Sequence, residues 1–316
     1  MTPATYASLT PPTSFFSLLT GDFSSPRSAE LTGRVELWDR DSPDYPTELQ
    51  DLTHPPLRLF ALGRAEGLAK PRVSIVGTRK STAYGERITR TLVASLVRAG
   101  VSVISGMARG IDGVAHRTAL EAGGRTVAVL GTGIDVPYPA GHRHLHRMIA
   151  EKGLVLSENP PGMPAHQGAF PKRNRIIAAL APVTIVVEAG HKSGALNTAG
   201  QALELGRIVA AVPGPIDSEQ SAGSNQLLRD GAVVIASVDD ALTLLGVIAP
   251  KQSEVDGQDL PESDRRLWEV LADGPADVDR LSAQTGLPLA ECLASISSLE
   301  ILGLVECSIG GEIRRV

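Results

Sequence analysis

The feature that most constrains this chain is a series of short apolar segments, four of which run into a glycine-containing turn, separated by helical patterns. Apolar residues recur at helical spacing in Tyr84–Ala99, for example. Strands that are apolar on both faces and alternate with helices indicate a parallel sheet covered on both sides. The pattern predicts an α/β fold with an extended Rossmann-like, doubly wound and mostly parallel sheet, whose strands we expect at Val73–Val76, Val101–Ser105, Thr126–Leu130, Leu154–Ser157, Thr184–Glu188, Ile208–Val212 and Val233–Ala236.

The composition favours a protein of the reducing interior of the cell. Of the 316 residues, 42% are hydrophobic but only 3% are aromatic, so the core is expected to consist of Val, Ile, Leu and Ala. Apolar runs stay shorter than the roughly 18–20 residues that span a bilayer. The two cysteines, Cys292 and Cys307, suit a reducing compartment and have no zinc-site spacing. We therefore expect a cytoplasmic protein that does not contact a membrane.

The formal net charge of −5 is unevenly distributed and does not exclude a nucleic-acid partner. Residues 262–316 contain 5 Lys/Arg and 10 Asp/Glu, whereas residues 1–261 contain 25 of each. A neutral body can carry a local basic pocket, which is what phosphate binding requires.

The chain divides into four segments by composition and periodicity. Residues 1–36, rich in Ser, Thr and Pro, are expected to be a disordered tail or the remnant of a small N-terminal module. Residues 37–246 form the main domain, which begins with a proline-rich connector containing a strand at Leu57–Leu62. Residues 247–262 form a linker. Residues 263–316 show a helix, a helix–turn–helix and a two-stranded wing, which predicts a winged-helix-like domain.

The last helix of this C-terminal pattern, Pro288–Leu302, contains two glutamates and lacks lysine and arginine. A helix that reads the major groove needs cations near the phosphates. We therefore expect this domain to contact protein rather than to read duplex DNA.

Glycine turns at the ends of the first two strands are candidate anion sites, because backbone amides can approach a phosphate closely there. The first turn contains Gly77, Thr78 and Arg79, and the second contains Ser105, Gly106, Arg109 and Gly110. Each turn carries an arginine that can make a bidentate phosphate contact. Neither turn matches a dinucleotide fingerprint or a P-loop, so no nucleotide cofactor is predicted.

The most informative phrase is Phe170–Ile177, in which three cations and an asparagine precede an apolar run. Lys172, Arg173 and Arg175 cannot all point inward on one helix, so some of them are expected to face a ligand. Asn174 can donate to a phosphate or a base, and Phe170 can stack on a base. Further on, Ser193 and Gly194 begin another helix and offer another anion-binding site.

Two constellations suggest catalysis or metal binding, and both have a structural alternative. Asp112 and His116 are four residues apart on one helical face and could act as acid and base, but a helix-dipole partner and a structural hydrogen bond explain them as well. His142, His144 and His146 could hold a metal, but they read better as surface histidines because the adjacent sequence lacks a carboxylate or thiol partner. We predict neither a catalytic nor a metal site.

Together these phrases resemble the DprA/Smf family, the DNA-processing proteins of bacterial natural transformation. The matching residues are Gly77–Arg79 with Tyr84-Gly85, Ser105–Asp112 with His116, Leu130–Pro139, Ser157-Glu158 with Pro160–Gly162, Phe170–Ile177, Glu188–Thr198, and Val212–Gly214 with Gly223–Asn225. The likeness covers about Leu37–Leu245 and extends to the winged-helix pattern. The irregular N-terminus departs from the helical module that many members carry.

The resemblance implies an extended Rossmann-like domain that binds and protects single-stranded DNA, forms a homodimer and loads the RecA recombinase during natural transformation and homologous recombination. Carried onto this chain, the pocket would use Gly77, Thr78, Arg79, Ser105, Gly106, Arg109, Gly110, Lys172, Arg173, Asn174 and Arg175, with Ser193 and Gly194. The low aromatic content favours sequence-tolerant binding through the phosphate backbone.

Two other functions remain open from the sequence. One is a nucleotide phosphoribohydrolase on a similar fold, for which Glu188–Thr198 lacks the expected spacing between its glycine loop and a catalytic glutamate. The other is an adaptor that acts through the acidic C-terminal domain.

Overall fold

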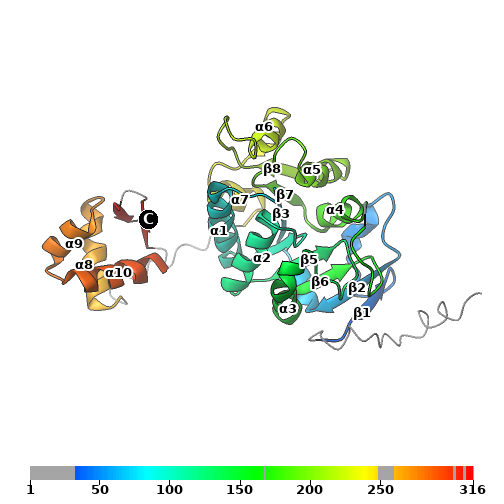
Figure 1. Ribbon diagram of the computed structural model, residues 1–316, viewed down its shortest axis with the longest axis horizontal. Coiled ribbons are helices and arrows are strands. Elements are labelled where there is room, and N and C mark those ends of the chain that lie inside the picture. Colours follow the sequence, from blue (N-terminus) through cyan, green and yellow to red (C-terminus); the bar gives the residue numbers. More distant parts are fainter. Residues whose placement is uncertain (1–32, 167, 248–259, 302–303, 309–310, 316) are drawn as a thin grey trace, which may run out of the picture. The chain divides into compact units, whose positions relative to one another are not determined.

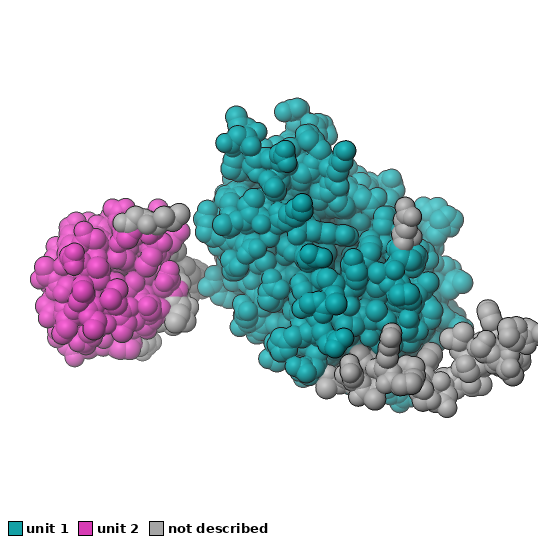
Figure 2. All heavy atoms as spheres, in the orientation of Figure 1, with its two compact units in different colours: residues 1–249 teal, residues 250–316 magenta. Residues whose placement is uncertain are grey.

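A computed structural model describes residues 33–166, 168–247, 260–301, 304–308 and 311–315. The chain forms two compact units, Met1–Ala249 and Pro250–Val316 (Figure 2). The expected N-terminal tail lies outside the described residues up to residue 32, and most of the expected linker lies outside them as well.

Within the described residues of the first unit, nine strands form one sheet in the order β1-β2-β6-β5-β4-β3-β7-β8-β9 (Figure 1). Strands β3 to β9 are mutually parallel, whereas β2 pairs antiparallel with both β1 and β6. The strands are β1 (Glu36–Asp39), β2 (Arg58–Gly63), β3 (Arg72–Val76), β4 (Ser102–Ser105), β5 (Thr126–Leu130), β6 (Leu154–Ser157), β7 (Val183–Val186), β8 (Ile208–Ala211) and β9 (Val233–Val234).

Helices cover both faces of this sheet (Figure 1). One face packs against α1 (Ala83–Arg98), α2 (Ile111–Glu121), α3 (Arg143–Lys152) and α7 (Val238–Leu244). The other packs against α4 (Ala169–Leu180), α5 (Gly194–Glu204), α6 (Ala222–Arg229) and the 3-10 helix η3 (Thr47–Asp51). Strands β3 to β5 are buried along their whole length because both of their faces are covered. The predicted doubly wound, mostly parallel α/β fold is confirmed.

The strand order reverses beside β3. From β3 the chain builds outward through β4, β5 and β6, and α4 then returns it to place β7 on the other side of β3. The carboxyl ends of β3 and β7 therefore diverge into different helices, which leaves a crevice between the two connections.

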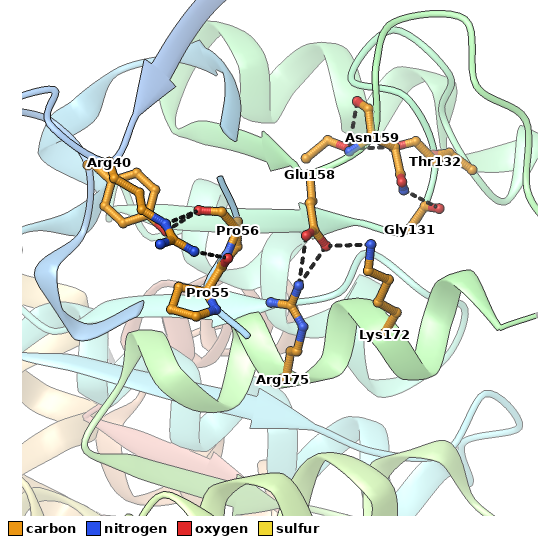
Figure 3. A network of polar contacts seen from close by, with 11 residues as sticks. Arg40, Pro55, Pro56, Gly131, Thr132, Glu158, Asn159, Lys172 and Arg175 are labelled. Atoms are coloured by element: carbon orange, nitrogen blue, oxygen red, sulfur yellow. Dashed lines mark hydrogen bonds and ion pairs between the residues drawn. The ribbon is translucent and has the colours of Figure 1, made fainter. Parts of the chain in front are cut away.

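The proline-rich connector forms more structure than the sequence indicated. Besides the expected strand, β2, it contributes β1 and η3, and β2 joins the main sheet antiparallel to β6. Hydrogen bonds within the connector fix its path, because Tyr45 Oη donates to Pro56 O at 2.7 Å and Arg40 Nη2 donates to Pro55 O at 2.7 Å (Figure 3). The four-residue β1 was missed because two of its residues are acidic, which obscures strand periodicity.

The second unit confirms the predicted winged helix. Helices α8 (Glu262–Val270), α9 (Val278–Thr285) and α10 (Leu289–Ile301) surround a core that includes Leu267, Leu281 and Leu299. Strands β10 (Val305–Cys307) and β11 (Ile313–Arg315) form the antiparallel wing, and Ala276 adds a bridge to Ile313. Across the described residues of both units, no helix is long and apolar enough to cross a membrane.

Candidate nucleic-acid interface

A pocket of about 590 Å³ lies where the connections after β3 and β7 diverge. Ligands of open α/β sheets bind in this position, outside the carboxyl ends of the strands at the reversal of strand order. Seven of the residues that the sequence selected line it: Gly77, Thr78, Arg79, Arg173, Asn174, Ser193 and Gly194. The other seven do not line it: Ser105, Gly106, Arg109, Gly110, Phe170, Lys172 and Arg175.

Hydrogen bonds to Glu188 hold the turn after β3, and the two cations of this turn, Arg79 and Lys80, are exposed. Thr78 N donates to Glu188 O at 2.6 Å, and the Glu188 carboxylate accepts from Thr82 N at 2.9 Å and from Thr82 Oγ1 at 2.7 Å. Glu188 is 1% exposed. It therefore connects the end of β7 to Thr82, the N-cap of α1. Its carboxylate is used in these structural hydrogen bonds and does not face a ligand.

Arg173 forms part of the pocket floor as a buried cation. It is 5% exposed, and its Nη1 donates to Gly106 O at 2.6 Å and also to Val129 O. Burial lowers the pKa of this guanidinium to about 10, an effect that the Asp112 carboxylate opposes. Arg173 is therefore still protonated at neutral pH. Its Nε lacks a hydrogen-bond partner within the described residues.

Asp112 holds the turn after β4 and places a negative charge near Arg173. It is 6% exposed, and its Oδ2 accepts from Ala108 N at 3.3 Å. Burial raises the pKa of this carboxyl group, whereas the charge of Arg173 lowers it. Gly106 leaves room for the same guanidinium, because a Cβ at this position would overlap Arg173.

Three exposed cations border the pocket: Arg79, Lys80 and Lys192. Of these, only Arg79 was among the residues predicted from the sequence. Lys80 directly follows it, and Lys192 directly precedes Ser193, so each adjoins a turn that was already recognised. The sequence signal for both lysines is therefore their position within one residue of a recognised turn. Glu219 and Gln220, from the loop before α6, also line the pocket.

The N-terminus of α5 lies at the pocket, because Ser193, Gly194 and Ala195 line it. Ser193 is the N-cap, and its Oγ accepts from Ala195 N at 3.3 Å. Asn174 Nδ2 donates to Gly194 O at 3.3 Å and to Asn197 Oδ1 at 3.1 Å, which ties α4 to α5. An eleven-residue helix that begins at a pocket favours an anion there through its dipole and its unpaired amides.

Arg79 also contributes to a small aromatic cluster. Its Cζ lies 5.1 Å from the ring centroid of Phe170, and the Phe170 and Tyr138 rings are 5.0 Å apart. Tyr138 is 41% exposed. The cluster therefore offers an accessible aromatic face next to a cation, although Phe170 is outside the pocket lining.

Three residues selected from the sequence have other partners. Ser105 is fully buried and its Oγ donates to Ile75 O at 2.7 Å, so its hydroxyl faces the neighbouring strand. Lys172 and Arg175 both contact the Glu158 carboxylate, Lys172 Nζ at 3.3 Å and Arg175 Nη2 at 2.8 Å (Figure 3). Of the three cations of α4, only Arg173 reaches the pocket.

Three of the candidate histidines have structural hydrogen-bond partners. The His116 Nδ1 lies 2.7 Å from Thr126 Oγ1, and burial lowers the pKa of this ring to about 3. His142 Nδ1 donates to Met107 O at 3.0 Å, whereas His146 Nε2 donates to Ile134 O at 2.8 Å. His146 is buried, so the expectation of a surface residue was wrong for it. Within the described residues, no group of three His, Cys, Asp or Glu could hold a metal.

Comparison with known proteins gives consistent matches for both units. The family model described as DNA recombination-mediator protein A matches residues 36–246, and the model described as DprA winged helix domain matches residues 251–311. The chain is 45% identical over 269 residues to the putative DNA processing protein DprA of Mycobacterium tuberculosis, an alignment that covers 81% of this chain and 68% of that protein. It is 37% identical over 283 residues to protein Smf of Escherichia coli, which covers 87% of this chain and 76% of that protein.

Two solved structures resemble the fold. DprA from Streptococcus pneumoniae matches with a TM-score of 0.64 and 38% identity, over 68% of this chain and 76% of that one. DprA from Helicobacter pylori, described with a single-stranded DNA binding mode, matches with a TM-score of 0.62 and 29% identity, over 68% of this chain and 96% of that one.

Proposed function

Because the chain belongs to the DNA recombination-mediator protein A family, we propose that it binds single-stranded DNA through the pocket at the strand-order reversal, without preference for base sequence. The observation that carries the proposal is the combination of three exposed cations, the buried guanidinium of Arg173 and the N-terminus of α5 around one pocket. These are groups that bind phosphate. The single-stranded DNA binding mode described for the Helicobacter pylori relative supports the choice of ligand.

The pocket favours contacts to the phosphate backbone over contacts to base edges. Its cationic groups are the exposed side chains of Arg79, Lys80 and Lys192 and the buried side chain of Arg173. Phosphate contacts position a strand but carry no sequence information. The aromatic cluster of Phe170 and Tyr138 can stack on any base, which is likewise tolerant of sequence.

Other members of the selected set fit this function from outside the pocket. Arg109 and Gly110 lie on the turn after β4, beside the turn that carries Arg79. We propose that Arg109 contacts a phosphate of the same strand, whereas Ser105, Gly106, Lys172 and Arg175 support the site through the contacts described above.

The proposal extends to the biological steps that family membership suggests. These are protection of single-stranded DNA and its transfer to the RecA recombinase during natural transformation and homologous recombination, in the cytoplasm. Membership in the family is the support for RecA as a partner, and the free thiols of Cys292 and Cys307 are compatible with a reducing compartment. We propose a binding function rather than catalysis. The support is that Glu188 and His116 form hydrogen bonds with Thr82 and Thr126, which are structural contacts.

A homodimer formed through the first unit is also part of the proposal. Its support is a group of exposed apolar side chains at the β9 end of the sheet, with Leu203 59% exposed, Ile208 41%, Val233 40% and Val234 50%. The two-residue strand β9 is an edge strand with unpaired backbone groups. Sedimentation of the Val234→Lys variant tests this, since a dimer that uses this edge should become monomeric.

The function is tested by fluorescence-anisotropy titration of the full chain with a labelled oligonucleotide, single-stranded and duplex, at two salt concentrations. We expect tight, salt-sensitive binding that favours the single strand and is the same for different base compositions. Absence of binding to either form would reject the proposal, and release of free base from a nucleoside monophosphate would then support the enzyme alternative.

A further inference from the structure

A second group of exposed cations lies outside the pocket, on the sheet face covered by α2 and α3. Arg109 is on the turn after β4, Arg117 is on α2, and Arg143 is the first residue of α3. Within the part of the chain that the structure describes, none of the three forms an ion pair. This distinguishes them from Lys172 and Arg175, which both form an ion pair with Glu158.

This group is continuous with the pocket. Gly110 adopts φ +71°, and a Cβ there would overlap the Thr78 carbonyl and approach Arg79 Cα at 3.1 Å. The turn that carries Arg109 therefore packs directly on the turn that carries Arg79. Because Gly110 has no side chain, the two arginine-bearing turns can lie in contact.

The same turn leads on to α2 and α3. Met107 O accepts the hydrogen bond from His142 Nδ1. A Cβ at Gly113 would lie 2.8 Å from His142 Cε1 and 3.3 Å from Arg117 Nη1, so the imidazole and the guanidinium are neighbours over Gly113. Arg143 directly follows His142. Neither Arg117 nor Arg143 lines the pocket, so the group extends from the pocket-bordering turns onto α2 and the start of α3.

Several charges act on His142, which lies among these arginines. Burial is the main reason that its pKa is lowered; the charges of Arg117 and Arg109 lower it further, whereas the hydrogen bond to Met107 O and the charge of Asp112 oppose this. The hydrogen bond from Ser81 Oγ at 2.9 Å is the main reason that the pKa of Glu86 is lowered, and the charges of Arg90, which pairs with it at 2.8 Å, and of Arg117 lower it further. Asp112 is buried near Arg173.

We propose that Arg109, Arg117 and Arg143 form a track for the phosphate backbone, on which single-stranded DNA continues from the pocket across α2 and the start of α3. This inference rests on the proposed function and adds Arg117 and Arg143 to the interface. The track binds only a strand long enough to fill the pocket and extend past it. It therefore makes affinity depend on strand length and adds to the salt dependence of binding.

The test compares two oligothymidines, of about 6 and about 20 nucleotides; the first lies near the lower end of the roughly 4–16 nucleotides that single-stranded-DNA-binding domains occupy, and the second exceeds that range. Anisotropy titrations at several salt concentrations use the full chain, the double variant Arg117→Ala/Arg143→Ala, and the control Arg64→Ala/Arg98→Ala. The control removes the same charge from exposed residues at the opposite, amino-terminal edge of the sheet. Arg79→Ala serves as a pocket variant.

For the long oligothymidine, we expect the track variant to bind about 5- to 20-fold more weakly, with a salt slope reduced by about 1.4 because two phosphate contacts are lost. Its affinity for the short oligothymidine should equal that of the unmodified chain, whereas Arg79→Ala weakens both. Unchanged binding of the long strand, or an equal loss in the control, would overturn the track. Failure of the unmodified chain to bind either oligonucleotide would instead reject the proposed function.

Discussion

The Nη2 of Arg175 donates to both carboxylate oxygens of Glu158, each at 2.8 Å (Figure 3). The two side chains are only 13% and 19% exposed, and Lys172 adds a third contact to the same carboxylate. The pair joins the end of β6 to α4, the helix that supplies Arg173 and Asn174 to the pocket. Arg175, a cation that the sequence assigned to the ligand, thus holds the position of the helix through Glu158.

This relationship leads us to expect that Arg175→Ala affects stability more than DNA binding. The substitution leaves the partly buried Glu158 with only the exposed Lys172, which should lower the free energy of unfolding by about 1–3 kcal/mol. Urea unfolding measures this loss. Binding by the folded variant should fall less than twofold, whereas Arg79→Ala should weaken it about 5- to 20-fold. Equal losses of binding in the two variants would show that Arg175 contacts the DNA.

Gly106→Ala should disturb the pocket floor. The added methyl group overlaps the Arg173 guanidinium, which is already held by Gly106 O, so the side chain or the turn must move. We expect a loss of about 1–3 kcal/mol in the free energy of unfolding, together with weaker DNA binding. The matched control is Gly200→Ala in α5, where a Cβ has open space and should stabilise the helix by about 0.5–1 kcal/mol. If Gly106→Ala behaves like this control, Arg173 is not held as described.

Glu219→Gln should strengthen DNA binding. This exposed carboxylate lines a pocket whose other exposed charges are cationic, and within the described residues it forms no ion pair. Removing its charge relieves repulsion of phosphate, by an amount typical of solvent-exposed charges, and we expect about a 2- to 5-fold gain in affinity at low salt. Asp239→Gln, an exposed acidic site on α7, provides the control for a general charge effect. Weaker binding by Glu219→Gln would instead indicate that the carboxylate accepts a hydrogen bond from a base.

Stability should fall on acidification because of His116. Its folded-state pKa of about 3 lies below the ordinary value of 6.5, so the unfolded chain binds a proton that the native ring does not. The stabilising contribution is complete above pH 6.5 and is lost as the pH falls toward 3. At pH 5 the loss from this one group is about 2 kcal/mol.

Urea unfolding at pH 7.5 and at pH 5 measures this loss. The His116→Asn variant, if folded, should show a smaller difference between the two pH values. A difference that is unchanged by the substitution would assign the effect to other groups, among which are His142 and His146, whose pKa values are also lowered by burial.

The sequence alone determined the order and type of most elements. Apolar segments such as those of β3, β4 and β5 are short and bounded by glycine, so local periodicity identifies them without knowledge of their neighbours. The family resemblance and the glycine turns after β3 and before α5 pointed to the edge of the sheet where the pocket lies. Local pattern failed at β1 and at His146, where the fold buries residues in segments that look polar.

Only the tertiary structure decided which polar side chains face the pocket. Lys172, Arg173 and Arg175 lie within four residues and are all cationic. Lys172 and Arg175 nevertheless pair with Glu158, whereas Arg173 donates to the carbonyl oxygens of Gly106 and Val129. Ser105 likewise donates its hydroxyl to Ile75 O, on the neighbouring strand. A long side chain adopts the direction that satisfies its buried hydrogen bonds, and those partners come from strands distant in sequence, so local spacing cannot specify it.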